Sequence, residues 1–192
     1  MNNRDRLFDL LYNRSFIYRE DPPFTLVSGR TSFYYFDCKA TTLDPEGVGL
    51  VGEVMLDAIG QLIDIGGIGG IGGLTLGADP ISISTAIAAH RRGIRLAPVI
   101  VRKEPKKHGT QKWVEGDLAK VKNVIAIDDV ITTGGSTITA IERMRESGLN
   151  VVQAAVIIDR EEGGRENIAG TGVEVLSLFT RSDFDARRLQ ER

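Results

Sequence analysis

Two adjacent carboxylates and a run of small polar residues lie directly after an apolar segment near the middle of the chain. Residues 124–127 read Val-Ile-Ala-Ile, which is typical of a buried parallel strand. Asp128 and Asp129 follow, and residues 132–137 read Thr-Thr-Gly-Gly-Ser-Thr. Carboxylates can accept hydrogen bonds from ribose hydroxyls or hold a hydrated Mg²⁺, and a glycine-rich turn that opens a helix can bind phosphate. The pattern predicts a ribose-phosphate site; the alternative is a helix start with a flexible turn and solvated acids.

A basic segment precedes this strand. Residues 102–117 form a polar stretch whose basic or titratable side chains are Arg102, Lys103, Lys106, Lys107, His108 and Lys112. Because the chain is slightly acidic overall, we expect this loop to be a lid that becomes ordered when its charges meet a polyanion. The alternative is a solvated, mobile loop.

A single arginine stands at the end of the next apolar run. Residues 151–158 are predicted to form a strand, and Arg160 follows at the same sheet edge as Asp128. A guanidinium there can bind a carboxylate through two parallel hydrogen bonds. The alternative is a salt bridge between Arg160 and a neighbouring acid.

The N-terminal part contains an unusually aromatic pair of short strands. Residues 24–27 and 33–36 are predicted to form a hairpin around Gly29. Most of the rings should pack together, and one or two should flank a flat base.

A glycine-dense segment follows a strand predicted at 62–65. Residues 66–73 contain six glycines, three of which formally spell G-x-G-x-x-G. We reject a dinucleotide site, because no helix opens after them and Arg91 and Arg92 stand where an acid is required. The segment predicts close approach of the backbone to a ligand at the end of a strand.

Helical and strand patterns alternate along the chain. A first helix is predicted to end near Asn13, and further helices follow Asp44 and Asp79. This order predicts an α/β fold with a mostly parallel central sheet flanked by helices. We expect one domain over residues 1–192, with a small hood from about residue 1 to 40 over the carboxyl ends of the strands.

The composition is that of an ordinary globular protein of 192 residues, with 42% hydrophobic and 26% charged residues. The formal net charge of -2 disfavours nucleic-acid binding. Cys38 is the only cysteine, which excludes an intrachain disulfide, and we interpret it as a small buried residue. No signal peptide or bilayer-spanning run is visible, so we expect a cytoplasmic protein without a membrane partner.

Three motifs in this order resemble a known family. VIAIDDVITTGGST at 124–137 is similar to the PRPP-binding signature of type I phosphoribosyltransferases. FTLVSGRTSFYYFD at 24–37 and VRKEPKKHGTQKWVEG at 101–116 both resemble orotate phosphoribosyltransferases. The resemblance covers roughly Leu7 to Thr180 and implies the type I phosphoribosyltransferase fold.

The resemblance also implies an activity and a set of site residues. Members transfer the ribose 5-phosphate of PRPP to orotate, which yields orotidine 5′-monophosphate and pyrophosphate in de novo UMP synthesis. The implied PRPP-binding residues are Arg102, Lys103, Lys106, His108, Asp128, Asp129, Val130, Ile131, Thr132, Thr133, Gly134, Gly135 and Ser136. Those implied to be catalytic are Lys103, Lys106, His108, Asp128 and Asp129. The implied orotate contacts are Tyr35, Phe36, Thr132 and Arg160.

The family further implies Mg²⁺ as cofactor, bound mainly through PRPP with no direct protein ligand, and a homodimer whose lid serves the neighbouring site. The chain departs from the pattern at Val27, where some members carry a lysine, at Phe33, which replaces a proline, and at Leu76-Gly77, which replaces a Tyr-Lys pair. The alternatives are transfer to another base and a non-catalytic PRPP sensor that controls transcription, although no basic DNA-binding segment is visible. A fusion with a decarboxylase would need a longer chain.

Overall fold

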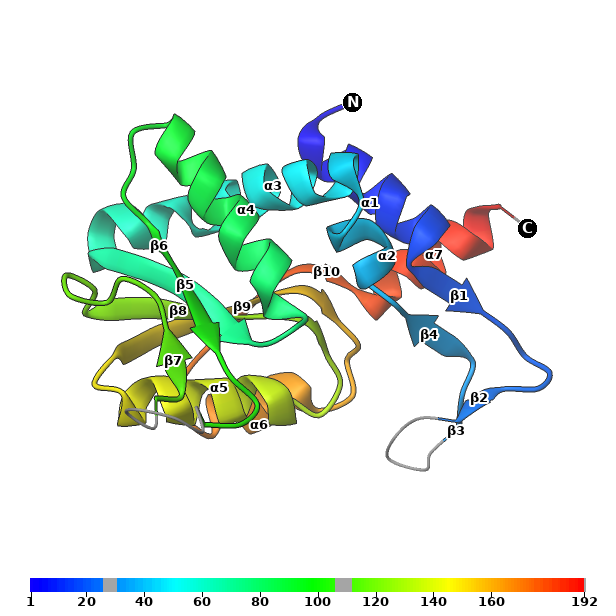
Figure 1. The fold of residues 1–192 in the computed structure, drawn as a ribbon. Coiled ribbons are helices and arrows are strands. Elements are labelled where there is room, and N and C mark those ends of the chain that lie inside the picture. Colours follow the sequence, from blue (N-terminus) through cyan, green and yellow to red (C-terminus); the bar gives the residue numbers. More distant parts are fainter. Residues whose placement is uncertain (26–30, 106–111, 192) are drawn as a thin grey trace.

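The computed structural model describes residues 1–25, 31–105 and 112–191. Within these ranges a six-stranded sheet forms the centre of the molecule (Figure 1). Its strands, in spatial order, are β10 (Val175–Thr180), β9 (Asn150–Asp159), β8 (Asn123–Ile131), β5 (Ile68–Leu74), β6 (Ala97–Val101) and β7 (Val114–Glu115). Every neighbouring pair is parallel except β6 and β7. The predicted α/β fold with a mostly parallel sheet is confirmed.

Helices cover both faces of the sheet (Figure 1). One face carries α1 (Asn3–Arg14), α3 (Pro45–Gly66) and α4 (Ala78–Arg91); the other carries α5 (Gly135–Glu146) and α6 (Gly164–Ala169). A parallel sheet covered on both faces needs apolar side chains in both directions, and each face has its own buried cluster. Two further helices, α2 (Lys39–Thr42) and α7 (Arg181–Gln190), complete those in the described ranges.

The strand order reverses between β5 and β8. From β5 the chain passes through α4 to β6, whereas from β8 it passes through α5 to β9 on the other side. The loops that leave the carboxyl ends of β5 and β8 therefore lead to opposite faces of the sheet, and open α/β sheets bind their ligands at such a switch point.

The glycine-dense segment is part of the sheet. The strand predicted at 62–65 is wrong, because α3 continues to Gly66 and ends at Gly67, whose φ of 58° is left-handed. The glycines that follow form β5 and allow it to lie tightly between its neighbours. A Cβ atom on Gly72 would stand 1.6 Å from the carbonyl oxygen of Val99, and one on Gly73 would stand 1.9 Å from that of Ile127.

The predicted pairing of residues 24–27 with residues 33–36 is wrong, although residues 24–25 do form an antiparallel pair, with residues 31–32. Strand β4 (Tyr34–Phe36) pairs antiparallel with β1 (Phe16–Tyr18), while β2 (Phe24–Thr25) pairs with β3 (Thr31–Ser32). The register places Phe16 opposite Phe36, with ring centroids 5.2 Å apart above the core. Aromatic cross-strand pairing thus selects a partner for β4 that is more distant in sequence.

None of the helices in the described ranges combines the length and apolarity that a membrane crossing requires.

Candidate active site

A cavity of about 620 Å³ opens at the carboxyl ends of β8 and β9. It is lined by Thr25, Tyr35, Asp128, Val130, Ile131, Thr132, Thr133, Gly134, Gly135, Ser136 and Arg160. The fold therefore brings together one predicted aromatic residue, the predicted phosphate loop and the predicted carboxylate-binding arginine, which lie far apart in the sequence.

The loop between β8 and α5 has the shape of an anion site. Its Gly134 has a φ of 82°, and no side chain caps the helix that begins at Gly135. The first N–H groups of a helix lack intrahelical partners, so they can donate to a phosphate. The loop rests on α6: a Cβ atom on Gly134 would stand 2.9 Å from the Gly164 carbonyl oxygen, and Asn167 Nδ2 donates to the Thr133 carbonyl at 2.9 Å.

Asp128 is buried at the inner end of this loop. Its carboxylate accepts hydrogen bonds from Thr137 Oγ1 at 2.8 Å and from the Asp129 N–H at 3.0 Å. Burial, followed by repulsion from Asp129, raises the pKa of Asp128 from 3.8 to about 7, and the Thr137 hydrogen bond opposes this rise. Asp128 is therefore a buried acid whose negative charge is disfavoured, next to the partly exposed Asp129.

Asp129 faces the loop that follows β5. A Cβ atom on Gly77 would stand 2.7 Å from Asp129 Oδ1, so the backbone of the loop after β5 closely approaches this carboxylate. Gly77 is one of the positions at which the chain departs from the family pattern. The close approach is a physical reason for a residue without a side chain there.

Arg160 presents a buried guanidinium to the cavity, with 7% of its side chain exposed. Its Nη2 donates to Ser32 Oγ at 3.2 Å and forms an ion pair with Glu162 Oε1 at 2.7 Å. The neighbouring-acid alternative is therefore realised in this structure. The Nε atom is buried and has no hydrogen-bond partner among the described residues, so the group retains a donor for a ligand.

The two aromatic residues proposed for base contact lie on opposite faces of β4. Tyr35 is 41% exposed, lines the cavity, and stacks on Phe24 with centroids 5.4 Å apart. Phe36 is 9% exposed and packs edge-on against Phe184 at 5.0 Å. Because successive side chains of a strand alternate, the fold brings only Tyr35 to the cavity.

The basic segment begins at the end of β6, outside the cavity lining. Arg102 Nη1 lies 3.5 Å from Glu115 Oε1, and its Nε donates to the Glu104 carbonyl at 3.2 Å. Lys103 is exposed. Predicted residues Lys106 and His108, like Val27, lie outside the described residues.

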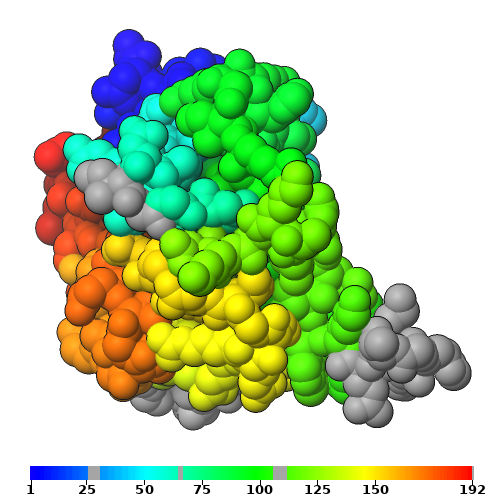
Figure 2. Space-filling model, turned by 90° about the vertical axis from the view of Figure 1, so that its left-hand side faces the viewer, coloured from blue at the N-terminus to red at the C-terminus, as the bar shows by residue number. Residues whose placement is uncertain are grey.

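The base of this segment is attached to α5. The Arg143 guanidinium stands 4.1 Å from the centre of the Trp113 ring and donates to the Arg102 carbonyl. Figure 2 shows the surface of α5, in yellow, next to the green residues that precede β8. The helix that follows the predicted phosphate loop therefore also holds the start of the basic segment.

Sequence reasoning missed four side chains at or near the site. Thr25 lines the cavity, Ser32 contacts Arg160, and Thr137 contacts Asp128. Lys39 forms an ion pair with Asp37 at 2.7 Å; that hydrogen bond chiefly raises the pKa of Lys39, and the charge of Asp129 adds to the rise. A hydroxyl in the first turn of the helix after Asp128 was a usable signal for Thr137. Only the fold brings Thr25 to the cavity, Ser32 to Arg160 and Lys39 towards Asp129.

The site's oxygen donors suit a hard cation. Within the described ranges no three His, Cys, Asp or Glu residues meet to form a protein-only metal site. Mg²⁺ is commonly bound by one or two carboxylates together with substrate phosphates and water, and Asp128 and Asp129 lie beside the predicted phosphate loop.

Cys38 is buried, as predicted, and burial raises the pKa of its thiol well above the usual value.

Residues 83–175 match the model of the phosphoribosyl transferase domain family. An orotate phosphoribosyltransferase of Leptospira biflexa serovar Patoc is 42% identical over 184 residues, which cover 95% of this chain and 98% of that protein.

Solved structures show the same fold. The Mycobacterium tuberculosis H37Rv orotate phosphoribosyltransferase in complex with Fe(III) dicitrate has a TM-score of 0.79 and 32% identity, over 95% of this chain and 99% of the other. The enzyme from the same organism in complex with PRPP has a TM-score of 0.75 and 29% identity, over 96% and 99% of the two chains.

Proposed function

The chain belongs to the orotate phosphoribosyltransferase family, and from that premise we propose that it transfers the ribose 5-phosphate of PRPP to orotate. The products are orotidine 5′-monophosphate and pyrophosphate. The observation that carries this proposal is the cavity in which the loop 130–136, Asp128 and Arg160 meet. The loop fits the 5′-phosphate, the acids fit the ribose hydroxyls, and the arginine fits the carboxylate of orotate.

The reaction requires positioning and charge stabilisation, and no nucleophilic side chain. As pyrophosphate leaves C1, positive charge develops on the ribose and negative charge on the leaving group. We assign Asp128 and Asp129 to the ribose hydroxyls, so that the buried negative charge lies near the sugar. Tyr35 flanks the base, and Thr132 and Arg160 orient it for attack by its ring nitrogen.

The leaving group needs cations. We assign this role to Arg102, Lys103, Lys106 and His108 of the basic segment. Mg²⁺ would be held mainly through PRPP and would neutralise charge on the pyrophosphate, with Asp128 and Asp129 as the carboxylates of the site. Closure of the segment would also exclude water, which would otherwise compete with orotate for C1.

We propose a homodimer with shared sites. Neither Arg102 nor Lys103 is among the described residues that line the cavity, which supports a contribution of the basic segment to a partner's site. Helix α4 offers a surface for a second copy, since Ile83 and Ile87 are 45% and 50% exposed one turn apart. We place the protein in the cytoplasm, within de novo UMP synthesis.

The decisive assay follows the loss of orotate absorbance after addition of PRPP and Mg²⁺, with uracil and hypoxanthine as controls. Consumption of orotate that requires both PRPP and the metal is the expected result. If the protein binds PRPP but consumes only another base, the substrate assignment fails. If it binds PRPP and consumes no base, the sensor alternative replaces the enzyme.

A further inference from the structure

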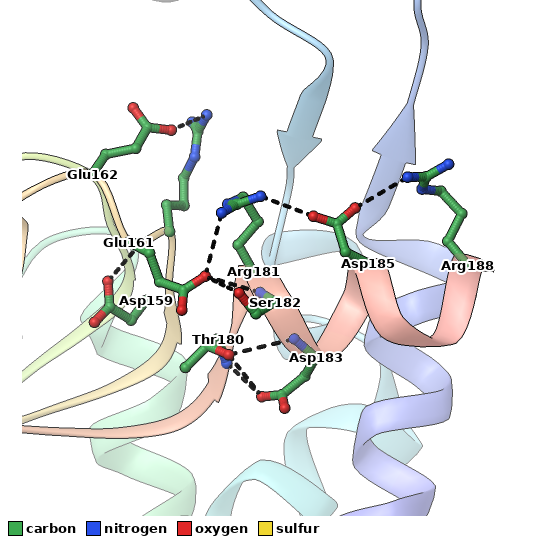
Figure 3. A network of polar contacts seen from close by, with 10 residues as sticks. Asp159, Glu161, Glu162, Thr180, Arg181, Ser182, Asp183, Asp185 and Arg188 are labelled. Atoms are coloured by element: carbon green, nitrogen blue, oxygen red, sulfur yellow. Dashed lines mark hydrogen bonds and ion pairs between the residues drawn. The ribbon is translucent and has the colours of Figure 1, made fainter. Parts of the chain in front are cut away.

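The turn that carries Arg160 is attached to the start of α7 through the next residue, Glu161. The Glu161 carboxylate accepts hydrogen bonds from the Ser182 N–H at 3.0 Å and from Ser182 Oγ at 2.6 Å (Figure 3). It also forms an ion pair with Arg181 at 3.6 Å. One side chain thus caps a helix and holds the turn against it.

Glu161 adopts a backbone conformation that disfavours a side chain. Its φ is 57°, and it is the one non-glycine residue with positive φ in the described ranges. Glycine is the usual residue in this region, because a Cβ atom is strained there. The conformation is held from two sides, since the Glu161 N–H also donates to Asp159 Oδ1 at 2.8 Å. An outlier held in this way beside a ligand cavity indicates a functional constraint.

The conformation of residue 161 determines how its two neighbours leave the sheet. Arg160, on one side, lines the cavity with its buried guanidinium. Glu162, on the other side, forms the 2.7 Å ion pair with that guanidinium. A different backbone conformation at Glu161 would redirect both members of this pair.

The same network continues to the N-terminal strands. Arg181 pairs with Asp185 at 2.8 Å, and Asp185 with Arg188 at 3.4 Å (Figure 3). The two arginines stand over tyrosine rings of the β1–β4 pair, Arg188 at 3.9 Å from Tyr18 and Arg181 at 5.5 Å from Tyr34.

Strands β3 and β4 contribute residues at the cavity. Tyr35 on β4 lines it, and Ser32 on β3 donates to the Tyr34 carbonyl at 3.0 Å and contacts Arg160. The Arg160 guanidinium is therefore contacted both by Glu162, next to the charged network, and by Ser32 of the N-terminal strands.

We propose that Glu161 is a positioning residue for the orotate pocket: by capping α7 it fixes the turn that carries Arg160, and through Arg181 it joins that turn to the strand that carries Tyr35. The inference rests on the proposed function, because it takes the orotate carboxylate as the ligand of Arg160. We assign PRPP, in contrast, to the loop after β8, whereas the polar partners of Glu161 among the described residues are Ser182, Arg181 and Asp159. Loss of Glu161 should therefore affect orotate and spare PRPP.

The test compares Michaelis constants of wild type, Glu161→Gly and Glu161→Gln for both substrates. The glycine variant removes the carboxylate but favours the left-handed backbone, so backbone strain cannot explain a defect. We expect its KM for orotate to rise about fivefold to tenfold, as for a misplaced binding group, and its KM for PRPP to stay within about twofold. The glutamine variant keeps an oxygen for Ser182 and should recover part of the orotate affinity.

Asp183→Ala is the matched control. Asp183 completes the capping box at the N-terminus of the same helix, where it accepts from the Thr180 N–H at 2.8 Å and from Thr180 Oγ1 at 3.1 Å; neither bond involves the Arg160 turn. Equal rises of the orotate KM in Asp183→Ala and Glu161→Gly would overturn the proposal in favour of general destabilisation of α7. An unchanged orotate KM in both Glu161 variants would also overturn it. A wild type that consumes no orotate would instead contradict the proposed function.

Discussion

At the scale of single residues, the buried acid Asp128 makes the stability of the fold depend on pH. The folded protein raises the pKa of Asp128 from 3.8 to about 7, so the native state retains a proton that the unfolded state loses. The contribution of this proton to the stability of the folded state is fully present below about pH 4 and is lost as the pH rises towards about 7.

Asp128→Asn removes this titration. The variant should lose most activity but gain thermal stability relative to wild type at about pH 8, and gain less at about pH 5, because the amide carries no charge to desolvate. Thermal unfolding midpoints at the two pH values provide the measurement. Asp117→Asn is the control, since Asp117 is exposed. A stability difference that does not change with pH would contradict the assignment.

Lys39 supplies a positive charge close to the acids, although the chain lacks the lysines that some relatives carry at positions 27 and 77. Lys39→Met should raise the KM for PRPP by about fivefold, because a cation near anionic substrate is worth roughly 1 kcal/mol. Initial rates at varied PRPP measure the effect. The exposed Lys120→Met serves as control, and an equal response of both variants would exclude a local role for Lys39.

At the scale of elements, the glycines of β5 and α3 should respond oppositely to alanine. A Cβ atom on Gly72 meets the Val99 carbonyl at 1.6 Å, so Gly72→Ala should cost about 3 kcal/mol or more. Gly49 lies inside α3 with no atom within 4 Å of a new Cβ, so Gly49→Ala should gain about 0.5–1 kcal/mol. Denaturant titration measures both, and a tolerated Gly72→Ala would refute the close strand contact.

Helix α5 connects the phosphate loop at its beginning with the basic segment near its end. Arg143→Gln removes the contacts to Trp113 and to the Arg102 carbonyl, so the KM for PRPP should rise about fivefold while the fold is retained. Trp113 is the chain's only tryptophan, so its fluorescence on PRPP addition reports the same region.

The control for this helix is Arg145→Gln, whose wild-type side chain donates to the Thr171 carbonyl instead. We expect its KM and its fluorescence response to match those of wild type. Identical defects in the two variants would mean that the loss of a positive charge on the helix is responsible. The specific attachment of the basic segment to α5 would then not explain the defect.

At the scale of the whole molecule, shared active sites can be tested by complementation. Lys103→Ala and Asp129→Asn should each be nearly inactive, and a mixture that forms heterodimers should recover part of the activity, because one site then has both intact groups. Verified heterodimers without recovery would argue against sharing.

The proposed dimer surface on α4 can be tested separately. Ile87→Glu should shift the protein towards the monomer in sedimentation, whereas Leu189→Glu, at another exposed apolar residue, should not.

Local order along the chain made much of the site predictable. A strand, a glycine-rich turn and a helix lie consecutively at 123–146, so residue types alone indicated where Asp128 and the phosphate loop would stand. Arg160 was predictable for the same reason, because parallel strands place their carboxyl ends at one edge. These features could be predicted from residues that are close in sequence, together with the rule that parallel strands end at the same edge of the sheet.

The remaining features depend on contacts between distant segments. The pairing of β4 with β1, the packing of β5 against Val99 and Ile127, and the choice of Tyr35 over Phe36 follow from burial that no local pattern contains. The contacts of Ser32 with Arg160 and of Glu161 with Ser182 likewise join residues remote in sequence. The sequence alone therefore determined the family, the reaction class and the strand, turn and helix at 123–146, whereas the tertiary structure decided which side chains line the cavity and what holds them, because packing selects those partners.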